Sequence, residues 1–206
     1  MTNRLPTELL IATRNEGKVA ELRPMLVELP LSLRSLKEFP EIDEVEETGT
    51  TFSENAALKA RSYAEQTRLW TLSDDSGLEV YALGGAPGVY SARYGGADLS
   101  YDERIKRLLD ELSQTGSDDR RARFVCVIAI ANAQGEIINL STGTCEGTIA
   151  RAPRGTNGFG YDPIFVPDDY EQTFGELLAE IKEKISHRAI ALEAARSFLQ
   201  NQFSLT

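Results

Sequence analysis

The chain has 206 residues, of which 41% are hydrophobic and 26% are charged, as in a globular protein. Asp and Glu total 32 against 22 Lys and Arg, and the net charge of −10 argues against a nucleic-acid backbone or an anionic membrane as partner. The longest apolar run, 124–131, is too short to cross a bilayer, and no secretory-signal pattern opens the chain. Cys126 and Cys145 stand apart and form no disulfide or zinc pattern. We therefore expect a cytoplasmic enzyme or binding protein whose residues 1–206 form one domain without a separable linker.

Strands and helices are expected to alternate in the first part of the chain. The apolar run over 8–13 predicts a buried strand, and Asn15 is placed to cap the helix that follows. Pro24 lies inside the apolar pattern of that helix and predicts a kink or break, because proline cannot donate the helical hydrogen bond. The alternation over 31–36 predicts a second strand, and the acidic, aperiodic stretch 37–49 predicts a loop.

A second helix and two short strands are expected next. The capping-box pattern TFSE opens a helix over 51–66. Residues 69–73 and 78–82 are predicted as strands on either side of a turn with the sequence SDDSG. This interpretation places Asp75 at the end of a strand, where a carboxylate would project from the edge of a sheet.

The second half of the chain predicts one more capped helix, a long hairpin and two closing helices. Ser100 and Glu103 form a capping box, and Ala133-Gln134-Gly135 joins the two strands of the hairpin. In chain order we expect a glycine-rich loop over 83–96, hairpin strands over 123–132 and 136–144, a strand near 147–150, a loop over 155–162, and helices that start near Thr173 and Ser186. Strands interleaved with helices, together with the hairpin, imply an α/β fold with a mixed β-sheet flanked by helices.

Two segments predict contacts with an anionic group. At the first strand-to-helix junction, free backbone N–H groups and Lys18 favour an anion, although an ordinary capped helix explains the same residues. His187 and Arg188 open the last predicted helix, where positive charge opposes the helix dipole unless an anion compensates it. Lys182 lies just upstream and is near enough in sequence to reach the same place, while a structural role remains the alternative for the lone histidine.

Acidic residues predict a divalent-cation site. Mg²⁺ prefers carboxylate oxygens and keeps waters and substrate phosphates as its other ligands. Glu46 and Glu47 alone are compatible with a solvated loop, but Asp74 and Asp75 at a strand end are less common, and their mutual repulsion calls for a cation or a raised pKa. Lys59 lies on a helix face at the edge of the predicted core, where either a phosphate contact or a structural lysine is consistent with the pattern.

A glycine-rich aromatic loop is the remaining candidate. In Gly158-Phe159-Gly160-Tyr161-Asp162, two glycines allow the backbone to approach a flat ligand and the Phe159 ring to stack on it. A tight turn with a core phenylalanine explains the same residues. Taken together, groups for phosphates, for Mg²⁺ and for a base are typical of an enzyme that acts on nucleoside triphosphates.

Five segments resemble, in order, the motifs of the inosine/xanthosine triphosphate pyrophosphatase family: ATRNEGK, EETGTTFSENAALKA, DDSGLEVYALGGAPGVYSARYGG, GFGYDPIF and KEKISHR. The resemblance extends from about Leu9 to Leu199, nearly the whole chain. It implies an elongated mixed sheet, two lobes with a cleft between them, and a homodimer.

The resemblance also implies residue roles. Asp75 corresponds to the catalytic aspartate, which is both proton acceptor and metal ligand, and Glu46 to the glutamate that binds Mg²⁺. The substrate contacts that it implies are Thr13, Arg14, Asn15, Glu16, Gly17, Lys18, Ser76, Phe159, Gly160, Tyr161, Asp162, Lys182, His187 and Arg188. To these we add Lys59 as a second lysine for charge on the phosphates.

The expected reaction is hydrolysis of XTP, ITP or dITP to the nucleoside monophosphate and pyrophosphate. A donor that meets the 6-oxo group of these bases would face the 6-amino group of adenine, and a buried donor left unpaired costs about 1–3 kcal/mol. Two alternatives stay open at this point. One is a Maf-type pyrophosphatase that acts on other nucleotides, and the other is a nucleotide-binding regulator without catalysis.

Overall fold

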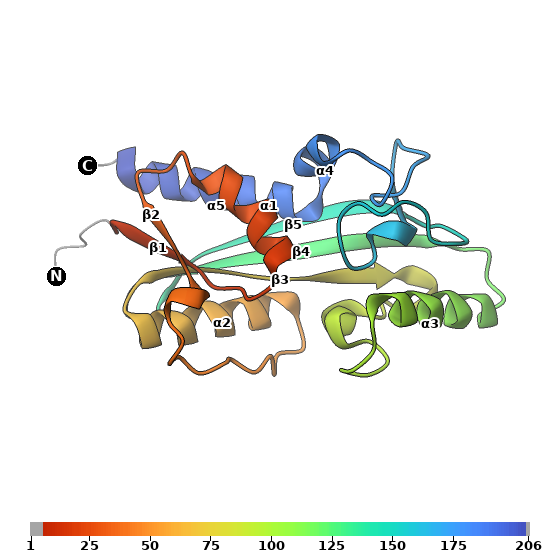
Figure 1. The fold of residues 1–206 in the computed structure, drawn as a ribbon, viewed down its shortest axis with the longest axis horizontal. Coiled ribbons are helices and arrows are strands. Elements are labelled where there is room, and N and C mark those ends of the chain that lie inside the picture. Colours follow the sequence, from red (N-terminus) through yellow and green to blue (C-terminus); the bar gives the residue numbers. More distant parts are fainter. Residues whose placement is uncertain (1–5, 205–206) are drawn as a thin grey trace. The chain divides into compact units, whose positions relative to one another are not determined.

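The computed structural model describes residues 6–204 and has a mixed α/β architecture (Figure 1). Its strands are β1 (Glu8–Ile11), β2 (Ser32–Ser35), β3 (Trp70–Val80), β4 (Arg121–Ala131), β5 (Ile137–Ile149) and β6 (Phe165–Pro167). Its α-helices are α1 (Glu16–Leu26), α2 (Phe52–Thr67), α3 (Tyr101–Gln114), α4 (Ala179–Ile185) and α5 (His187–Ser204). Short 3₁₀ helices are η1 (Leu36–Glu38), η2 (Tyr81–Leu83), η3 (Gly88–Arg93) and η4 (Asp162–Ile164). None of the helices within residues 6–204 combines the length and apolar character needed to cross a membrane.

The strands form one mixed sheet in the order β2-β1-β3-β4-β5-β6. Strand β1 pairs in parallel with β2 and β3, whereas β6 pairs antiparallel with β5. Hydrogen bonds from Asn132 N to Glu136 O and from Gly135 N to Asn132 O close the β4–β5 hairpin. The predicted α/β class with a mixed sheet and a long hairpin is therefore confirmed.

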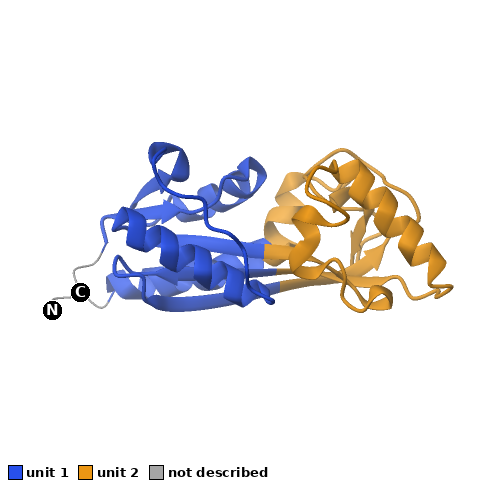
Figure 2. Ribbon diagram, turned by 90° about the horizontal axis from the view of Figure 1, so that it is seen from below, with its two compact units in different colours: residues 1–75, 126–143, 188–206 blue, residues 76–125, 144–187 orange. Residues whose placement is uncertain are grey.

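The chain divides into two compact units (Figure 2). Unit 1 comprises residues 1–75, 126–143 and 188–206, and unit 2 comprises residues 76–125 and 144–187. Each unit is assembled from segments that are distant in the sequence. The chain passes between the units after Asp75, Val125, Gly143 and His187, so Ser76 and Arg188 belong to a different unit from their chain neighbours Asp75 and His187.

The core of unit 1 lies on both faces of its strands. Helices α1 and α5 cover one face and α2 covers the other (Figure 1). Leu22 and Leu26 of α1 pack with Leu9 and Ile11 of β1 in one cluster, while the intervening Leu10 packs with residues from the α2 side. This alternation follows from the two-residue period of a strand. The Asn15 cap and the Thr51–Glu54 capping box form as the sequence predicts.

Unit 2 is built around aromatic side chains. Phe124 of β4 contacts Phe165 and Phe174 at ring-centroid distances of 4.6 and 6.2 Å. The apolar stripe of α3 packs against this cluster, and the Ser100–Glu103 capping box opens that helix as expected. The cluster supplies a rigid base for the loops of unit 2 that carry predicted site residues.

The prediction of two short strands around an SDDSG turn is wrong. Strand β3 runs without interruption from Trp70 to Val80, and Asp74 and Asp75 lie in its middle, buried to 1% and 5% exposure. A polar run in an isolated sequence is typical of a turn. Here the polar groups find partners in the tertiary structure, such as Lys18 for Asp74 and Ser91 for the backbone of Leu78, so the strand continues.

Three boundaries also differ from the predictions. The segment expected as a separate strand near 147–150 belongs to β5, which extends to Ile149. The helix expected near Thr173 begins only at Ala179, because the N–H groups of Phe174 and Gly175 donate to Phe165 and Asp162 instead of forming a helical turn. Pro24 does not end α1, which continues for two more residues to Leu26.

Candidate active site

Asp74 and Asp75 point to opposite faces of β3, because successive side chains of a strand alternate. On the α1 side, Lys18 Nζ lies 2.9 Å from Asp74 Oδ2, and Arg188 Nε lies 3.4 Å from the same oxygen. Arg188 is itself only 2% exposed and also pairs with Glu21 of α1. One buried aspartate therefore has two cationic neighbours, and one of these is balanced by a further carboxylate.

This arrangement keeps Asp74 ionised. Burial by itself would raise the pKa of Asp74, but the positive charges of Lys18 and Arg188 outweigh it and hold the pKa well below its ordinary value. In return, the carboxylates of Asp74 and Glu21 outweigh the burial of Arg188 and raise the pKa of its guanidinium. Asp74 is thus a fixed anion that anchors Lys18 and Arg188.

Asp75 has a different environment on the α2 side. Its Oδ1 lies 3.4 Å from Lys59 Nζ, and Lys59 also pairs with Glu47 from the loop before α2. Its Oδ2 is buried and has no hydrogen-bond partner among the described residues. Burial raises the pKa of Asp75; Lys59 opposes this increase and the neighbouring Glu47 adds to it. A carboxylate with an unsatisfied buried oxygen and a raised pKa has the properties of a ligand for a cation or of a general base.

The donors around Asp75 fit a hard divalent cation. Asp75 and Glu47 bring carboxylate oxygens to one lysine, and the unsatisfied Oδ2 of Asp75 is available to a further positive group. No three His, Cys, Asp or Glu side chains within residues 6–204 are grouped as a protein-only metal cage. Mg²⁺ needs only one or two carboxylates, with waters and phosphates as the remaining ligands, so the donor set suits it. Glu46, the predicted ligand, is exposed, whereas its neighbour Glu47 makes the contact to Lys59.

The predicted anion loop is an ordered turn at the start of α1. Thr13 Oγ1 accepts a hydrogen bond of 3.2 Å from Asn15 N, and Asn15 Oδ1 accepts one of 3.1 Å from Lys18 N. Lys18 points to Asp74, whereas Glu16 pairs with Lys37 at the surface. The loop holds Lys18 in place, and Gly17 follows the capping residue in the first turn of α1.

In unit 2, the predicted aromatic loop is closed by Asp162. Phe159 N donates a 2.8 Å hydrogen bond to Asp162 Oδ2, which also lies 2.5 Å from Lys182 Nζ. Lys182 Nζ lies 4.9 Å above the centre of the Phe159 ring, a cation–π contact. Gly158 has a φ of 73°, and a Cβ there would lie 2.0 Å from Asp162 Oδ2, so only glycine fits this turn. Phe159, Asp162 and Lys182 thus form one local assembly.

The remaining predicted residues of unit 2 have structural contacts. The Tyr161 ring is buried edge-on against Tyr101, and its hydroxyl donates to Ser91 O at 3.0 Å. His187 is 4% exposed and stacks on Phe124 with an interplanar angle of 11°. Ser76 is half-buried on β3, and Gly160 has a φ of 66° in the aromatic loop. These contacts fix the loop and the start of α5.

Two residues in these groups escaped the sequence reasoning. Glu21, which pairs with Arg188, lies one turn after Lys18 on α1. Residues at this spacing lie on the same face of a helix, so the sequence could have indicated that Glu21 lies near Lys18. Glu47, which pairs with Lys59, is adjacent to Glu46, and no pattern in the sequence distinguishes the two glutamates. Partly buried lysines beside buried carboxylates on one strand, together with a glycine-flanked aromatic loop in unit 2, are typical of enzymes that act on phosphorylated nucleotides.

The particular family follows from comparison with known proteins. The chain belongs to the Ham1 family, whose sequence model matches residues 9–198. A dITP/XTP pyrophosphatase from Halalkalibacterium halodurans is 46% identical over 192 residues, which cover 93% of this chain and 98% of that protein. One from Desulforamulus reducens is 48% identical and covers 95% of this chain and 97% of its own length. The family resemblance predicted from the motifs is confirmed.

Solved structures agree with the sequence relatives. A HAM1 protein from Coxiella burnetii superimposes with a TM-score of 0.88 at 43% identity, over 94% of this chain and 98% of that chain. The Ham1 protein of Staphylococcus aureus gives a TM-score of 0.85 at 41% identity, over 95% of this chain and 99% of that chain. The fold described above is therefore that of the family.

Proposed function

We propose that the chain hydrolyses XTP, ITP and dITP to the nucleoside monophosphate and pyrophosphate, and so removes these non-standard purine nucleotides from the nucleotide pool. Relatives named dITP/XTP pyrophosphatase match it over nearly the full length of both chains. The observation within the site that supports this reaction best is the buried, unsatisfied Oδ2 of Asp75 beside Lys59. A phosphoanhydride hydrolase needs a base for water and cations for the phosphates, and this group supplies both.

In the proposed mechanism, Asp75 orients a water and accepts its proton as the water attacks the α-phosphorus. The bond from that phosphorus to the bridging oxygen breaks, and pyrophosphate leaves with the electron pair. Lys18 and Lys59 stabilise the charge that develops on the phosphates, and the start of α1 after Asn15 adds the positive end of the helix dipole. Asp74 is no candidate for the base, because Lys18 and Arg188 hold its carboxylate.

The proposed cofactor is Mg²⁺, held by Asp75 and Glu46. Glu47, which already contacts Lys59, is the alternative second ligand on this structure. When bound, the ion neutralises charge on the triphosphate and makes the phosphorus more electrophilic. Burial raises the pKa of Asp75, and Lys59, 3.4 Å away, opposes this rise and so favours the ionised carboxylate that either role needs.

Recognition of the base is assigned to the aromatic loop of unit 2. Phe159 is the proposed stacking ring, with Gly160, Tyr161 and Asp162 shaping its loop and Lys182 over its face. Donors of this loop, or those of His187 and Arg188, would meet the 6-oxo group that XTP, ITP and dITP share. The 6-amino group of adenine would leave such a donor unpaired, at a cost of about 1–3 kcal/mol.

Pyrophosphate release from XTP, ITP, dITP, ATP, GTP and dTTP at matched concentration, with Mg²⁺, tests the proposal. We expect strong release from the first three nucleotides and little from the others. Release from dTTP or UTP instead would assign the chain to Maf-type specificity. Binding of dITP without release of pyrophosphate would identify a nucleotide-binding regulator and overturn the proposed function.

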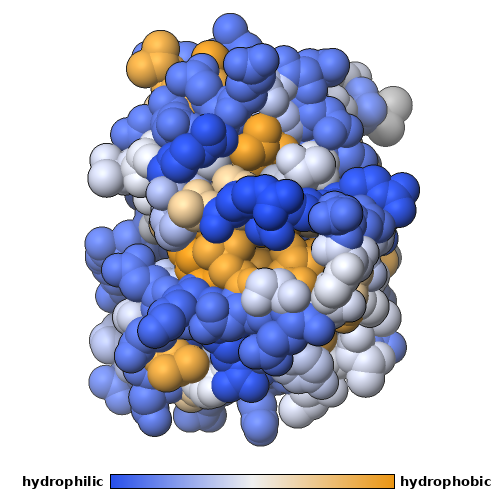
Figure 3. Space-filling model, turned by 90° about the vertical axis from the view of Figure 1, so that its right-hand side faces the viewer, coloured by the Kyte–Doolittle hydropathy of each residue, from blue (hydrophilic) through white to orange (hydrophobic). Residues whose placement is uncertain are grey.

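We also propose that the enzyme works as a cytoplasmic homodimer. Apolar side chains gather in a hollow on one face of the molecule and are bordered by hydrophilic ones (Figure 3). Tyr81 and Tyr90 of unit 2 are 40% and 55% exposed, and an exposed apolar patch with a polar rim is typical of a protein–protein contact. Light scattering of the purified chain should give twice the mass of one chain, and a monomer mass would contradict this proposal.

A further inference from the structure

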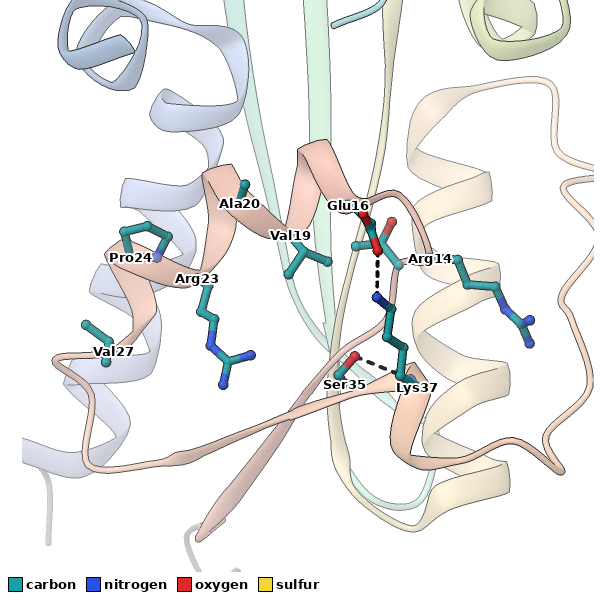
Figure 4. Close-up of a pocket in the computed structure, with 10 residues that line it drawn as sticks. Arg14, Glu16, Val19, Ala20, Arg23, Pro24, Val27, Ser35 and Lys37 are labelled. Atoms are coloured by element: carbon teal, nitrogen blue, oxygen red, sulfur yellow. Dashed lines mark hydrogen bonds and ion pairs between the residues drawn. The ribbon is translucent and has the colours of Figure 1, made fainter. Parts of the chain in front are cut away.

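A pocket of about 640 Å³ lies on the outer face of α1 in unit 1 (Figure 4). One wall is α1 itself, with Val19, Ala20, Arg23 and Pro24, and the other includes Ser35 at the end of β2 and Lys37 in η1. The volume lies in the range of about 300–1,000 Å³ that is usual for small-molecule sites. We refer to this cavity as the outer α1 pocket.

The outer α1 pocket shares Thr13, Arg14 and Glu16 with the turn before α1, but it does not include the Asp74 and Asp75 groups. Residues that line it recur at positions 16, 19, 20, 23, 24 and 27, the spacing of a single helix face. Lys18 and Glu21 lie on the other face and contact Asp74 and Arg188. One helix therefore carries candidate active-site residues on one side and the pocket wall on the other.

Positive charge gathers in this pocket, although the chain as a whole carries −10. Arg23 and Lys37 extend into the space between the two walls, and Arg14 points away at one end (Figure 4). Arg23 forms no ion pair with any residue in the described part of the chain, and it affects Glu38 only at a distance. Lys37 pairs with Glu16 at 2.6 Å, but both side chains are mostly exposed, so this pair exchanges readily with another anion.

The other end of the pocket is apolar. Val27 is 66% exposed, and Pro24 lies beside it (Figure 4). Val19 continues this apolar strip toward the middle of the pocket. A cationic centre next to an apolar strip is complementary to a ligand with an anionic group and a flat or apolar body.

We propose that the outer α1 pocket binds a purine nucleoside monophosphate, with the phosphate between Arg23 and Lys37 and the base against Val19, Pro24 and Val27. Two cations match the charge of a single phosphate, whereas Glu16 and Glu38 nearby disfavour a polyphosphate. The choice of a purine monophosphate rests on the proposed function, because it is the product of that reaction. A ligand here also contacts the helix that holds Lys18 and Glu21, so the pocket is placed to report product concentration to the Asp74 group.

Titration calorimetry with inosine monophosphate on the full chain tests this site. Arg23→Glu and Val27→Asp alter exposed positions of the pocket, and Arg61→Glu on the exposed face of α2 is the charge-matched control. We expect wild type and Arg61→Glu to bind inosine monophosphate at two sites, one of them the product position of the active site. Arg23→Glu should weaken one of the two sites about tenfold or more, the loss of a charge-assisted contact.

Pyrophosphate release from dITP, measured on the same variants at low product concentration, separates this proposal from the proposed function. Unchanged release in Arg23→Glu, together with the lost site, supports the pocket. Identical calorimetric curves for wild type, Arg23→Glu and Val27→Asp would overturn it, whatever the enzyme activity. Inorganic phosphate that binds as tightly as inosine monophosphate, with no effect of Val27→Asp, would overturn the assignment to a nucleotide.

Discussion

On one face of β3, Asp74 lies between Lys18 and Arg188, whereas on the other face Asp75 shares Lys59 with Glu47. The two aspartates are neighbours in sequence and both are buried. Their pKa values nevertheless shift in opposite directions, downward for Asp74 and upward for Asp75. Two carboxylates with different environments can take different roles, because burial opposes ionisation and nearby cations favour it.

This comparison suggests that the Asp74 face of β3 stabilises the fold and that the Asp75 face carries out the chemistry. The Asp74 face has paired charges that would be costly to separate. On the Asp75 face, burial outweighs the nearby lysine and raises the pKa of the carboxyl, a property typical of functional sites. Substitutions on the two faces should therefore separate activity from folding.

The largest effect on activity is expected for Asp75→Asn. The amide cannot accept the proton of the attacking water, so kcat should fall roughly 100- to 10,000-fold, the range for loss of a general base. The free energy of unfolding should not decrease, because the raised pKa of Asp75 shows that its ionised form is disfavoured in the folded state. Pyrophosphate release and urea unfolding measure the two quantities. Wild-type kcat in this variant would remove Asp75 from its role.

Asp74→Asn should instead destabilise the fold. The change leaves Lys18 and Arg188 without their shared carboxylate in a buried place, which costs about 3–5 kcal/mol. The control is Asp119→Asn, which breaks the exposed pair with Arg121 and should cost about 1 kcal/mol or less. Urea unfolding of both variants measures the difference. Equal stability of the two variants would contradict the role given to the Asp74 face.

Lys59→Met should move the acid limb of the pH–rate profile. Lys59 lowers the pKa of Asp75, so its removal lets that pKa rise further, and the base is ionised only at higher pH. The limb should therefore shift toward higher pH, while Lys106→Met, an exposed lysine of α3, leaves it in place. A profile that shifts in neither variant, or toward lower pH in Lys59→Met, would count against Asp75 as the titrating group.

Stability should respond to pH with opposite signs at the two aspartates. The lowered pKa of Asp74 stabilises the fold above about pH 4, its unfolded pKa, and this contribution is lost as pH falls below that value. The raised pKa of Asp75 gives a penalty that grows as pH rises above the same value. The stability deficit of Asp74→Asn relative to wild type should therefore become smaller when the pH is lowered from 7 to 3. Any stability gain of Asp75→Asn over wild type should also become smaller over this range. Thermal unfolding across this range checks both slopes.

The smallest effect on stability is expected for a change in the Glu21–Arg188 pair, which lies next to Asp74. Glu21→Gln removes the partner of buried Arg188 and should cost about 1–3 kcal/mol. The matched control is Glu28→Gln, which breaks an exposed pair with Arg196 of α5 and should cost about 0.5 kcal/mol or less. Denaturant unfolding resolves this difference. Equal losses of unfolding free energy in the two variants would show that the Glu21–Arg188 pair contributes no more than an exposed surface pair.

Several features of the fold could be predicted from the sequence because they depend on interactions between residues that are close together in the chain. The caps at Asn15, Thr51 and Ser100, the β4–β5 hairpin and the α/β class follow from patterns within a few residues of one another. The family followed from motifs that keep their order along the chain. Apolar periodicity and turn chemistry are carried by the residues themselves, so they can be read before folding.

The tertiary structure decided how the polar residues of β3 are used. SDDSG has the local composition of a turn, and only cations from α1, α2 and α5 allow its aspartates to remain buried in a continuous strand. No local pattern identifies the partner of Glu21 or of Glu47, because these partners, Arg188 and Lys59, lie 167 and 12 residues away in the chain. The sequence by itself determined the capped helices, the hairpin, the family and the chemical groups. Folding decided which cation meets which carboxylate, since that depends on the alternation of one strand between helices from distant parts of the chain.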